Sequence, residues 1–332
     1  MEIKKHQEWI DIAKGVAILL VVIGHSFPDA AVRGGVRIES LQTFREVIYL
    51  FHIPLMFFIS GMLSKRIFRH AEHNDRWHYI YDRFKRLMIP YFCVGILYMP
   101  FKLLLSRYAN RPYDIANFWK IIFGENPDGG LWFLYALFLT QVLMGLILTK
   151  ERMKAFVVIS LICSFLLICF DIHFFRVSSA IYNTSFAACG LWFGCSASYQ
   201  RNASLKHFFA VSLPFVIVIC LFILTKNPYC KLFAGFWGSF TIVYLCKWLA
   251  NGKWTWFKKP LMMFGDYTMD IYIFHGIIMV IVRILVYSVL GLNYYLCCGL
   301  MLVIGLLLPI LISKYVVRPI PVFKRYLLGD YK

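Results

Sequence analysis

Long apolar stretches fill almost the whole chain, and they limit what it can fold into more than any other feature. Each approaches the roughly 20 residues that a membrane-spanning helix needs. The ten stretches lie at residues 12–28, 46–65, 87–106, 131–149, 154–171, 180–198, 207–225, 231–250, 267–290 and 294–314. Because a bilayer offers the backbone no hydrogen-bond partners, such stretches cross it as helices. We therefore predict an all-α fold, a polytopic transmembrane helical bundle of about ten spans.

The composition supports this class. The chain has 332 residues, of which 60% are hydrophobic and 18% aromatic, and its mean hydropathy is +0.67. A soluble chain of this length would be far more polar. The first stretch does not fit a cleavable signal peptide, because Lys14 and Gly15 interrupt it and no small-residue cleavage site follows. We expect one membrane domain over residues 1–332, with its longest loops near 27–45, 66–86 and 107–130.

A net charge of +18 raises the question of nucleic-acid binding, but the distribution of the basic residues argues against it. Lysine and arginine are concentrated in alternate loops, such as 65–86, 150–154, 253–259 and the tail from 314 onward. The intervening loops carry fewer of them and mix them with acidic residues. This is the positive-inside pattern, which predicts that both termini lie in the cytoplasm. We expect the bilayer, and no nucleic acid, as a partner.

The first apolar stretch contains two ionisable residues, Lys14 and His25. At about 100° and 1.5 Å per residue, they fall within roughly 20° of one helix face and roughly 16 Å apart along the axis. Ionisable groups within the hydrocarbon are costly and therefore indicate function. Asp11 lies three residues before Lys14, where an ion pair can hold the lysine in place.

Two more histidines, His52 and His275, lie inside other stretches, and a simple packing role stays open for both. Arg83 and Arg86 precede the third stretch at the same cytoplasmic depth as Lys14. They fit snorkelling cations at a helix end, but arginine forks are also natural partners of phosphate. A cationic cluster facing the cytoplasm suits a polyphosphorylated cofactor.

The remaining candidates are less specific. Trp132 opens the fourth stretch at the outer surface, where it fits either an interfacial aromatic belt or a stacking surface for sugars. Arg283, in the outer half of the ninth stretch, needs a partner or a water-filled cavity. The ten cysteines lack metal-ligand spacing with histidine, so we read them as small buried hydrophobes and expect no metal.

Five fragments together resemble the acyltransferase-3 family of integral membrane O-acyltransferases, in the branch that resembles fucose 4-O-acetylases. The fragments are Trp9-Ile-Asp11-Ile-Ala-Lys14-Gly15 through Gly24-His25, Phe51-His52 through Ser60-Gly61, Arg83-Phe-Lys-Arg86 through Pro90-Tyr91, Leu131-Trp132-Phe133-Leu134, and Gly265 through Tyr272-Ile-Phe-His275. They occur in the family's order. The family commonly has arginine where this chain has Lys14, which keeps the charge but loses the bidentate fork.

The resemblance implies transfer of an acyl group, usually acetyl, from cytoplasmic acyl-CoA to a sugar hydroxyl of an envelope glycan. It also implies a multi-pass protein of a bacterial cell membrane. His25, with His52, would be catalytic, and His25 would act as a general base or become acylated itself. The residues expected to bind acetyl-CoA are Asp11, Lys14, Arg83, Arg86, Tyr272 and His275, and those expected to bind the acceptor are Trp132, Ser60 and Arg283.

The acceptor is expected to be a lipid-linked or exported sugar. Some relatives carry a soluble extracytoplasmic domain that completes the transfer, and this chain ends at Lys332 without one. We therefore expect it to acylate the acceptor directly or to pass the group to a separate protein. Two alternatives remain open: a ten-helix secondary transporter, although no pair of matching interrupted helices is evident, and a membrane sensor that binds without turnover.

Overall fold

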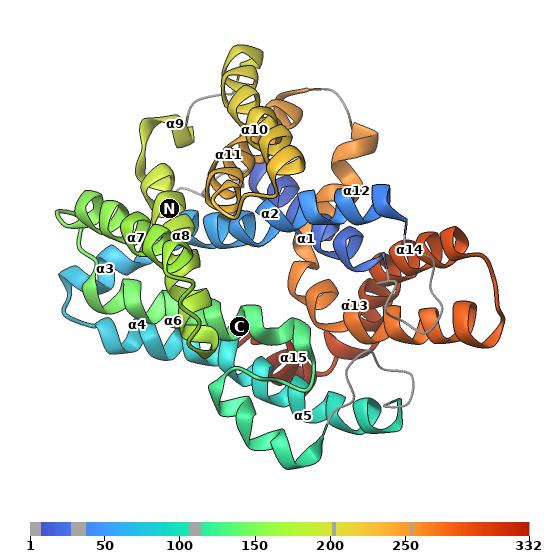
Figure 1. The fold of residues 1–332 in the computed structure, drawn as a ribbon. Helices are drawn as coiled ribbons and strands as arrows, with labels where there is room; N and C mark the ends of the chain where they lie inside the picture. The colour runs from blue at the N-terminus through green and yellow to red at the C-terminus, as the bar shows by residue number, and fades with distance from the viewer. Residues whose placement is uncertain (1–7, 28–37, 106–113, 201–203, 253–254, 332) are drawn as a thin grey trace.

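The computed structural model describes residues 8–27, 38–105, 114–200, 204–252 and 255–331, and within these ranges it contains helices and no strand (Figure 1). The α-helices are α1 (Glu8–His25), α2 (Glu39–Met62), α3 (Arg66–Glu72), α4 (Arg76–Arg83), α5 (Ile89–Leu104), α6 (Trp132–Ile147), α7 (Met153–Cys169), α8 (Phe175–Cys195), α9 (Ala197–Gln200), α10 (Leu205–Thr225), α11 (Cys230–Asn251), α12 (Thr255–Asp266), α13 (Thr268–Arg283), α14 (Tyr294–Ile312) and α15 (Pro321–Leu328). The predicted all-α fold is confirmed.

Every predicted stretch coincides with a helix. In the part of the chain that the structure describes, seven helical segments are long and apolar enough to cross a membrane. The predicted spans at α1, α7 and α8 fall short for separate reasons. Helix α1 carries Glu8, Asp11 and Lys14, α7 has only 17 residues, and α8 is diluted by serine, asparagine, threonine and glycine.

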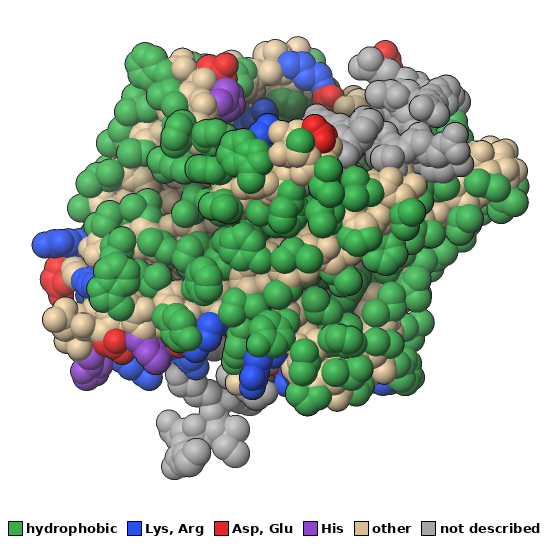
Figure 2. Space-filling view, turned by 90° about the horizontal axis from the view of Figure 1, so that it is seen from below, with side chains coloured by type: hydrophobic (Ala, Val, Ile, Leu, Met, Phe, Trp, Pro, Cys, Tyr) green, Lys and Arg blue, Asp and Glu red, His purple; other side chains and the backbone are tan. Residues whose placement is uncertain are grey.

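The surface agrees with a membrane setting. Figure 2 shows a broad band of hydrophobic side chains, with charged side chains gathered mainly at its upper and lower edges. Helix α10 is an example, because most of its long apolar side chains are exposed, including Leu213, Ile217 and Leu224. Such a helix is stable only where lipid or protein covers it. The molecule is therefore a polytopic helical membrane protein.

The segment at 66–86 is not the loop that the sequence led us to expect. It forms α3 and α4, and α4 continues into α5 as one helical segment from Arg76 to Leu104. A π-helical turn at Phe84–Met88 joins the two. Pro90 lacks the N–H that would bond the Arg86 carbonyl in a regular α-helix, which accounts for the wider turn. Arg86 therefore lies in an irregular turn, a kind of place where functional residues are common.

The expected outer loops also contain structure. The loop near 27–45 is shorter than predicted, because α2 begins at Glu39, and residues 28–37 lie outside the described part. In the loop near 107–130, residues 106–113 lie outside it, and a 3₁₀ helix spans Ile115–Phe123. A second short 3₁₀ turn, Gly129–Leu131, leads directly into α6.

Helix α1 occupies the middle of the bundle and contacts α2, α11, α12 and α13. Two glycines allow the backbones of α1 and α12 to approach each other closely. A Cβ on Gly15 would lie 1.9 Å from the Leu261 carbonyl oxygen of α12, and a Cβ on Gly265 would lie 2.1 Å from the Asp11 carbonyl oxygen. Backbones can approach this closely only where side chains are absent, as at the small-residue contacts of other membrane helices.

The C-terminal part of the described chain packs against α13 and α5. Buried Asp270 of α13 accepts hydrogen bonds from Ser313 and from Arg318, whose Nη2 lies 2.9 Å from Oδ2. Helix α15 then lies beside α5 (Figure 1). A Cβ on Gly329, directly after α15, would lie 2.4 Å from the carbonyl oxygen of Arg86. The end of the described chain is thus packed against the turn that carries Arg86.

Candidate active site

A cavity of about 560 Å³ is lined by residues from α1, α2, α3, α4 and its following π-helical turn, α6, α12 and α13. Four cations line it, and we name it the cationic cavity. They are Lys14, Arg66, Arg83 and Arg86. Asp266 is the acidic residue among its lining residues. Even after the charge of Lys14 is balanced by Asp11 behind it and Asp266 is counted, positive charge remains in excess, so the cavity is a favourable place for an anion.

Two cations of this cavity, Lys14 and Arg83, contact other side chains of the protein. Lys14 Nζ lies 2.5 Å from Oδ1 of Asp11, whose side chain is buried. The guanidinium of Arg83 lies over the ring of Tyr79, 4.9 Å from its centroid. The buried Nε of Arg83 has no hydrogen-bond partner. Because an unpaired buried donor is costly, this nitrogen indicates that a ligand completes the site.

The cationic cavity also has a neutral polar wall. Gln141 Nε2 donates to Ser60 Oγ at 3.3 Å, and Ser64 Oγ donates to Gln141 Oε1 at 3.3 Å. Ser60, Ser64 and Gln141 all line the cavity. Ser60, which the sequence assigned to the acceptor, therefore lies in the same cavity as Lys14 and the arginines.

A second cavity of about 810 Å³ lies along α1 toward its C-terminal end. We name it the histidine cavity, because His25 and His52 both line it. Tyr49, Trp132 and Lys231 line it as well. The ring of Tyr49 lies between the two histidines, 6.3 Å from His25 and 4.9 Å from His52 by ring centroids. The structure thus brings His25, His52 and Trp132 together at one site.

Asn183 of α8 adds an unpaired acceptor to the histidine cavity. The residue is only 3% exposed, and it lines this cavity. Its Nδ2 donates to the Ser179 carbonyl at 2.8 Å, but its buried Oδ1 has no partner. A carboxamide oxygen in this position can accept a hydrogen bond from a hydroxyl group of a ligand.

Backbone carbonyls fix the tautomer of His275. Its Nδ1 donates to the carbonyl oxygens of Ile271 and Tyr272, at 2.9 and 2.8 Å. Because carbonyl oxygens only accept, Nδ1 carries the hydrogen of the neutral ring, and Nε2 is an acceptor. His25 Nδ1 lies 3.1 Å from this Nε2 and therefore donates to it. The hydrogen of neutral His25 is thus on Nδ1, and its Nε2 keeps a free lone pair.

His52 has the same arrangement. Its Nδ1 lies 2.9 Å from the Ile48 carbonyl oxygen and donates to it. The lone pair of neutral His52 is therefore on Nε2 as well. Two imidazoles in one cavity thus each keep a nitrogen that can take up a proton, which is what general base chemistry requires.

The two cavities meet at a common wall. Phe133 and Tyr272 line both of them. The Tyr272 hydroxyl donates to the Gly130 carbonyl oxygen at 2.5 Å, and the Gly130 N–H donates to the Asp128 carboxylate at 2.9 Å. Burial raises the pKa of the Asp128 carboxyl, and the Gly130 N–H bond acts in the opposite direction. The turn before α6 therefore anchors the ring of Tyr272, which lines both cavities.

Three candidates from the sequence line neither cavity. His275 lies against His25, and Asp11 lies behind Lys14, so of the residues assigned to acetyl-CoA only Lys14, Arg83, Arg86 and Tyr272 line the cationic cavity. Arg283 is buried between α13 and α14 and lines neither cavity. Sequence reasoning in turn missed Arg66 and Asn183. Arg66 was counted as a topology signal, and Asn183 had only its unusual polarity within an apolar stretch to mark it.

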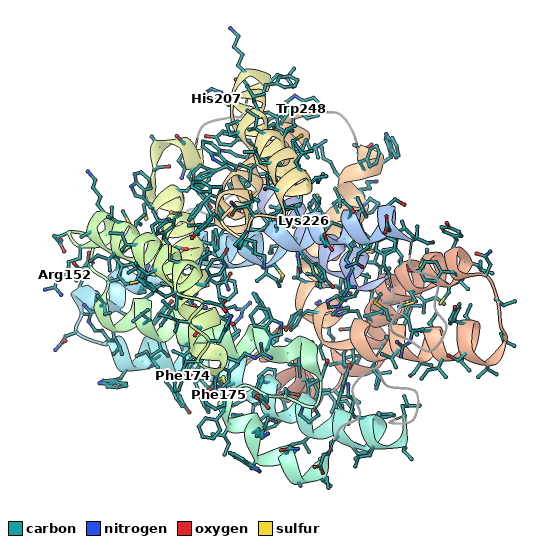
Figure 3. The ribbon with its side chains drawn as sticks, in the orientation of Figure 1. Arg152, Phe174, Phe175, His207, Lys226 and Trp248 are labelled. Atoms are coloured by element: carbon teal, nitrogen blue, oxygen red, sulfur yellow. The ribbon has the colours of Figure 1, made fainter. Side chains whose placement is uncertain are left out.

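The other histidines in the described part of the chain are exposed or half-buried. His207, at the start of α10, lies at the periphery of the bundle (Figure 3). Its ring bonds Ser204 Oγ at 2.6 Å, which is a local contact at a helix start. His207 is therefore a suitable reference for the histidines that line the cavity.

Comparisons with known proteins agree with the resemblance seen in the sequence. Residues 7–313 match the acyltransferase-3 family model, described as an acyltransferase domain. The chain is also 25% identical over 156 residues to the nodulation protein NolL of Mesorhizobium japonicum, a match that covers 45% of this chain and 38% of that protein. No solved structure matches the chain significantly. Since the family match covers nearly the whole chain, the protein belongs to the acyltransferase-3 family and is a multi-pass membrane acyltransferase.

Proposed function

We propose that this acyltransferase moves an acetyl group from cytoplasmic acetyl-CoA to a sugar hydroxyl of a lipid-linked or exported envelope glycan. One observation carries the proposal. A cavity lined by four cations and a cavity lined by His25 and His52 lie end to end along the same helices. The first suits the phosphates of a nucleotide donor, and the second offers bases for a hydroxyl acceptor.

The donor occupies the cationic cavity. Lys14, Arg83 and Arg86 contact its phosphates, and Arg66 adds a fourth cation that the sequence did not single out. The unpaired Nε of Arg83 supports a direct phosphate contact, because charge-assisted bonds to phosphate are the strongest that an arginine makes. The thioester then lies toward His25, roughly 16 Å along α1 from Lys14.

The acceptor occupies the histidine cavity. Trp132 offers an aromatic face to the sugar, and Asn183 Oδ1 accepts a hydrogen bond from one of its hydroxyl groups. His25 Nε2 takes the proton of the reacting hydroxyl as its oxygen attacks the thioester carbonyl. The new C–O bond forms, the C–S bond breaks, and the proton passes from His25 to the departing CoA thiolate.

The site sits in a bacterial cell membrane, with the cationic cavity reached from the cytoplasm. The acyl group reaches the glycan directly or through a separate extracytoplasmic acceptor protein. A transporter would instead move a solute without needing CoA, and a sensor would bind acetyl-CoA without releasing CoA. Turnover of acetyl-CoA therefore distinguishes an acyltransferase from a transporter and from a sensor.

The test uses the purified protein in liposomes with acetyl-CoA labelled on the acetyl group. We expect slow hydrolysis without an acceptor and transfer of label when envelope glycans are added. His25→Ala should abolish both reactions at normal expression, and His52→Ala should weaken them. The matched control is His207→Ala, because His207 is exposed, lines neither cavity and lies at the periphery of the bundle (Figure 3). Near wild-type turnover in His25→Ala would remove this residue from the mechanism.

A further inference from the structure

Two aromatic side chains lie where the cationic cavity and the histidine cavity adjoin. Phe133 of α6 and Tyr272 of α13 are the residues that line both. Their ring centroids are 5.5 Å apart, and their planes are inclined by 64°. Only 5% of Phe133 and 6% of Tyr272 is exposed. The rings are therefore packed against each other at the point where a molecule would have to cross from one cavity to the other.

A donor held by its phosphates must bring its acyl group past these rings. The cations that would hold it lie in one cavity, and His25 lies in the other. This step rests on the proposed function, since only a donor that reaches His25 needs the crossing. A close-packed aromatic pair leaves no room for a thioester, so at least one ring must move.

The two rings are held in different ways. The Tyr272 hydroxyl donates to the Gly130 carbonyl at 2.5 Å. Phe133 has no polar atom in its side chain, and its described ring contacts are with Phe57, 5.1 Å away and nearly perpendicular, and with Tyr272. Breaking the Tyr272 bond would leave a buried polar group unpaired, whereas turning Phe133 gives up only packing. Turning Phe133 is therefore the less costly of the two movements.

We propose that Phe133 and Tyr272 form an aromatic septum that determines which acyl group reaches His25. Phe133 turns aside when the donor binds, and Tyr272 stays anchored to the turn before α6. The width of the opening then depends on these two side chains, so a short acyl group passes and a longer one does not. The pair would thus select the donor by acyl chain length.

The first experiment compares donors of different length. Release of CoA is measured with acetyl-CoA and butanoyl-CoA for the wild type and for Phe133→Ala. We expect the butanoyl-to-acetyl ratio of kcat/KM to rise roughly 15-fold in the variant, which corresponds to accommodating two more methylene groups. Met144→Ala is the control, because Met144 is fully buried on the same helix but lines neither cavity. An unchanged ratio in Phe133→Ala would overturn the proposal.

A second experiment does not depend on turnover. Ile53 lines the histidine cavity but not the cationic cavity, so Ile53→Cys places a thiol beyond the septum. A small, membrane-impermeant thiol reagent is added on the side where the cationic cavity opens, and modification of residue 53 is followed by mass spectrometry. We expect slow modification with Phe133 intact and severalfold faster modification with Phe133→Ala.

The two experiments separate the septum from the proposed function. If residue 53 reacts equally fast with and without Phe133, the rings are no barrier, and the septum is wrong even for an active acetyltransferase. If removal of Phe133 speeds the modification of residue 53 but no acyl-CoA is ever turned over, the two rings are a barrier between the cavities and the proposed acyl transfer is wrong. In that case its role in choosing the acyl group fails as well.

Discussion

At the scale of single residues, the tautomer of His25 is set by a residue 250 positions away. His275 Nδ1 is committed to two carbonyl oxygens of its own helix, so its Nε2 can only accept from His25. This bond keeps the hydrogen of His25 on Nδ1 and the lone pair on Nε2. We therefore treat His275 as a positioning residue, although the family resemblance implied that it binds acetyl-CoA.

The first prediction concerns this bond. His275→Phe removes the acceptor, so His25 is free to take the other tautomer and other ring orientations. We expect kcat to fall roughly 10- to 100-fold, which is less than the roughly 10²- to 10⁴-fold that a positioned general base contributes, because His25 itself remains in place. The KM for acetyl-CoA should change little, because His275 does not line the cationic cavity. Steady-state kinetics normalised to folded protein measure both values.

The control for this prediction is His275→Gln. Its carboxamide oxygen can still accept a hydrogen bond, so we expect it to recover part of the lost kcat. A purely structural role for His275 would instead lower the amount of folded protein in both variants and leave the kinetics per folded molecule unchanged.

The second prediction concerns the cations. Arg83→Ala and Arg86→Ala should each raise the KM for acetyl-CoA roughly 10- to 100-fold, the worth of a charge-assisted hydrogen bond. Lys14→Arg should be tolerated, because arginine is common at this position in the family that the sequence resembles. Arg83→Lys should be tolerated less well if the phosphate contact is bidentate. If these side chains only extend to the membrane surface and bind no phosphate, the folded variants will have the same KM for acetyl-CoA as the wild type.

Two comparisons sharpen this test. Arg152 is exposed and lies at the periphery of the bundle (Figure 3), so Arg152→Ala should leave the KM unchanged. A donor that lacks the 3′-phosphate, acetyl-dephospho-CoA, should bind the wild type more weakly. If one arginine variant has the same KM for acetyl-CoA and acetyl-dephospho-CoA, the arginine replaced in it contacts the 3′-phosphate.

The sequence could predict only part of this site, and the reason is the separation of the contacts along the chain. Lys14 and His25 share one helix, so helical geometry alone placed them on one face. The bond between His25 and His275 depends on the packing of α1 against α13, which no local pattern encodes. Arg66 was not singled out among the other basic residues of a presumed loop, because an arginine that sets topology and an arginine that binds a ligand look the same in sequence.

At the scale of helices, glycines set how closely α1 and α12 approach. The third prediction is that Gly15→Ala destabilises the protein by about 1–3 kcal/mol, the usual cost of overpacking. The new methyl group would lie 1.9 Å from the Leu261 carbonyl oxygen, and backbone cannot easily give way. Thermal unfolding in detergent measures the change. Activity should fall as well, because the same contact positions Lys14.

The matched control is Gly299→Ala in α14, where a Cβ would meet nothing within 4 Å. Alanine is favoured over glycine inside a helix by roughly 0.5–1 kcal/mol, so this variant should be as stable as the wild type or slightly more stable. Equal melting temperatures for Gly15→Ala and Gly299→Ala would contradict the close packing of α1 on α12.

Helices were predicted better than the segments between them. Hydropathy located every long helix, because length and apolar content are local properties. It missed α3 and α4, whose charged and aromatic residues gave no long apolar run, although α4 buries Tyr79 and Ile80. It also missed α15, which is short and basic and is held by contacts with α5 and with the Arg86 turn.

At the scale of the whole molecule, the positive-inside pattern predicts that the two cavities open on opposite sides of a membrane. Residue 66 of α3 lines the cationic cavity, and residue 173, before α8, lines the histidine cavity. The positive-inside pattern places the loop around residue 66 in the cytoplasm. Residue 173 follows α7, which is preceded by another basic loop, so the same pattern places residue 173 outside. Donor and acceptor would therefore arrive from opposite sides.

The last prediction tests this arrangement in intact cells. Arg69→Cys and His173→Cys each place a thiol at an exposed position, the first on α3 beside the cationic cavity and the second at the histidine cavity. A membrane-impermeant maleimide should modify residue 173 in intact cells and residue 69 only after the membrane is opened. Mass spectrometry identifies the modified residue, because ten native cysteines are also present. Labelling of residue 69 in intact cells would invert the topology, and acetyl-CoA in the cytoplasm would then face the histidine cavity instead of the four cations.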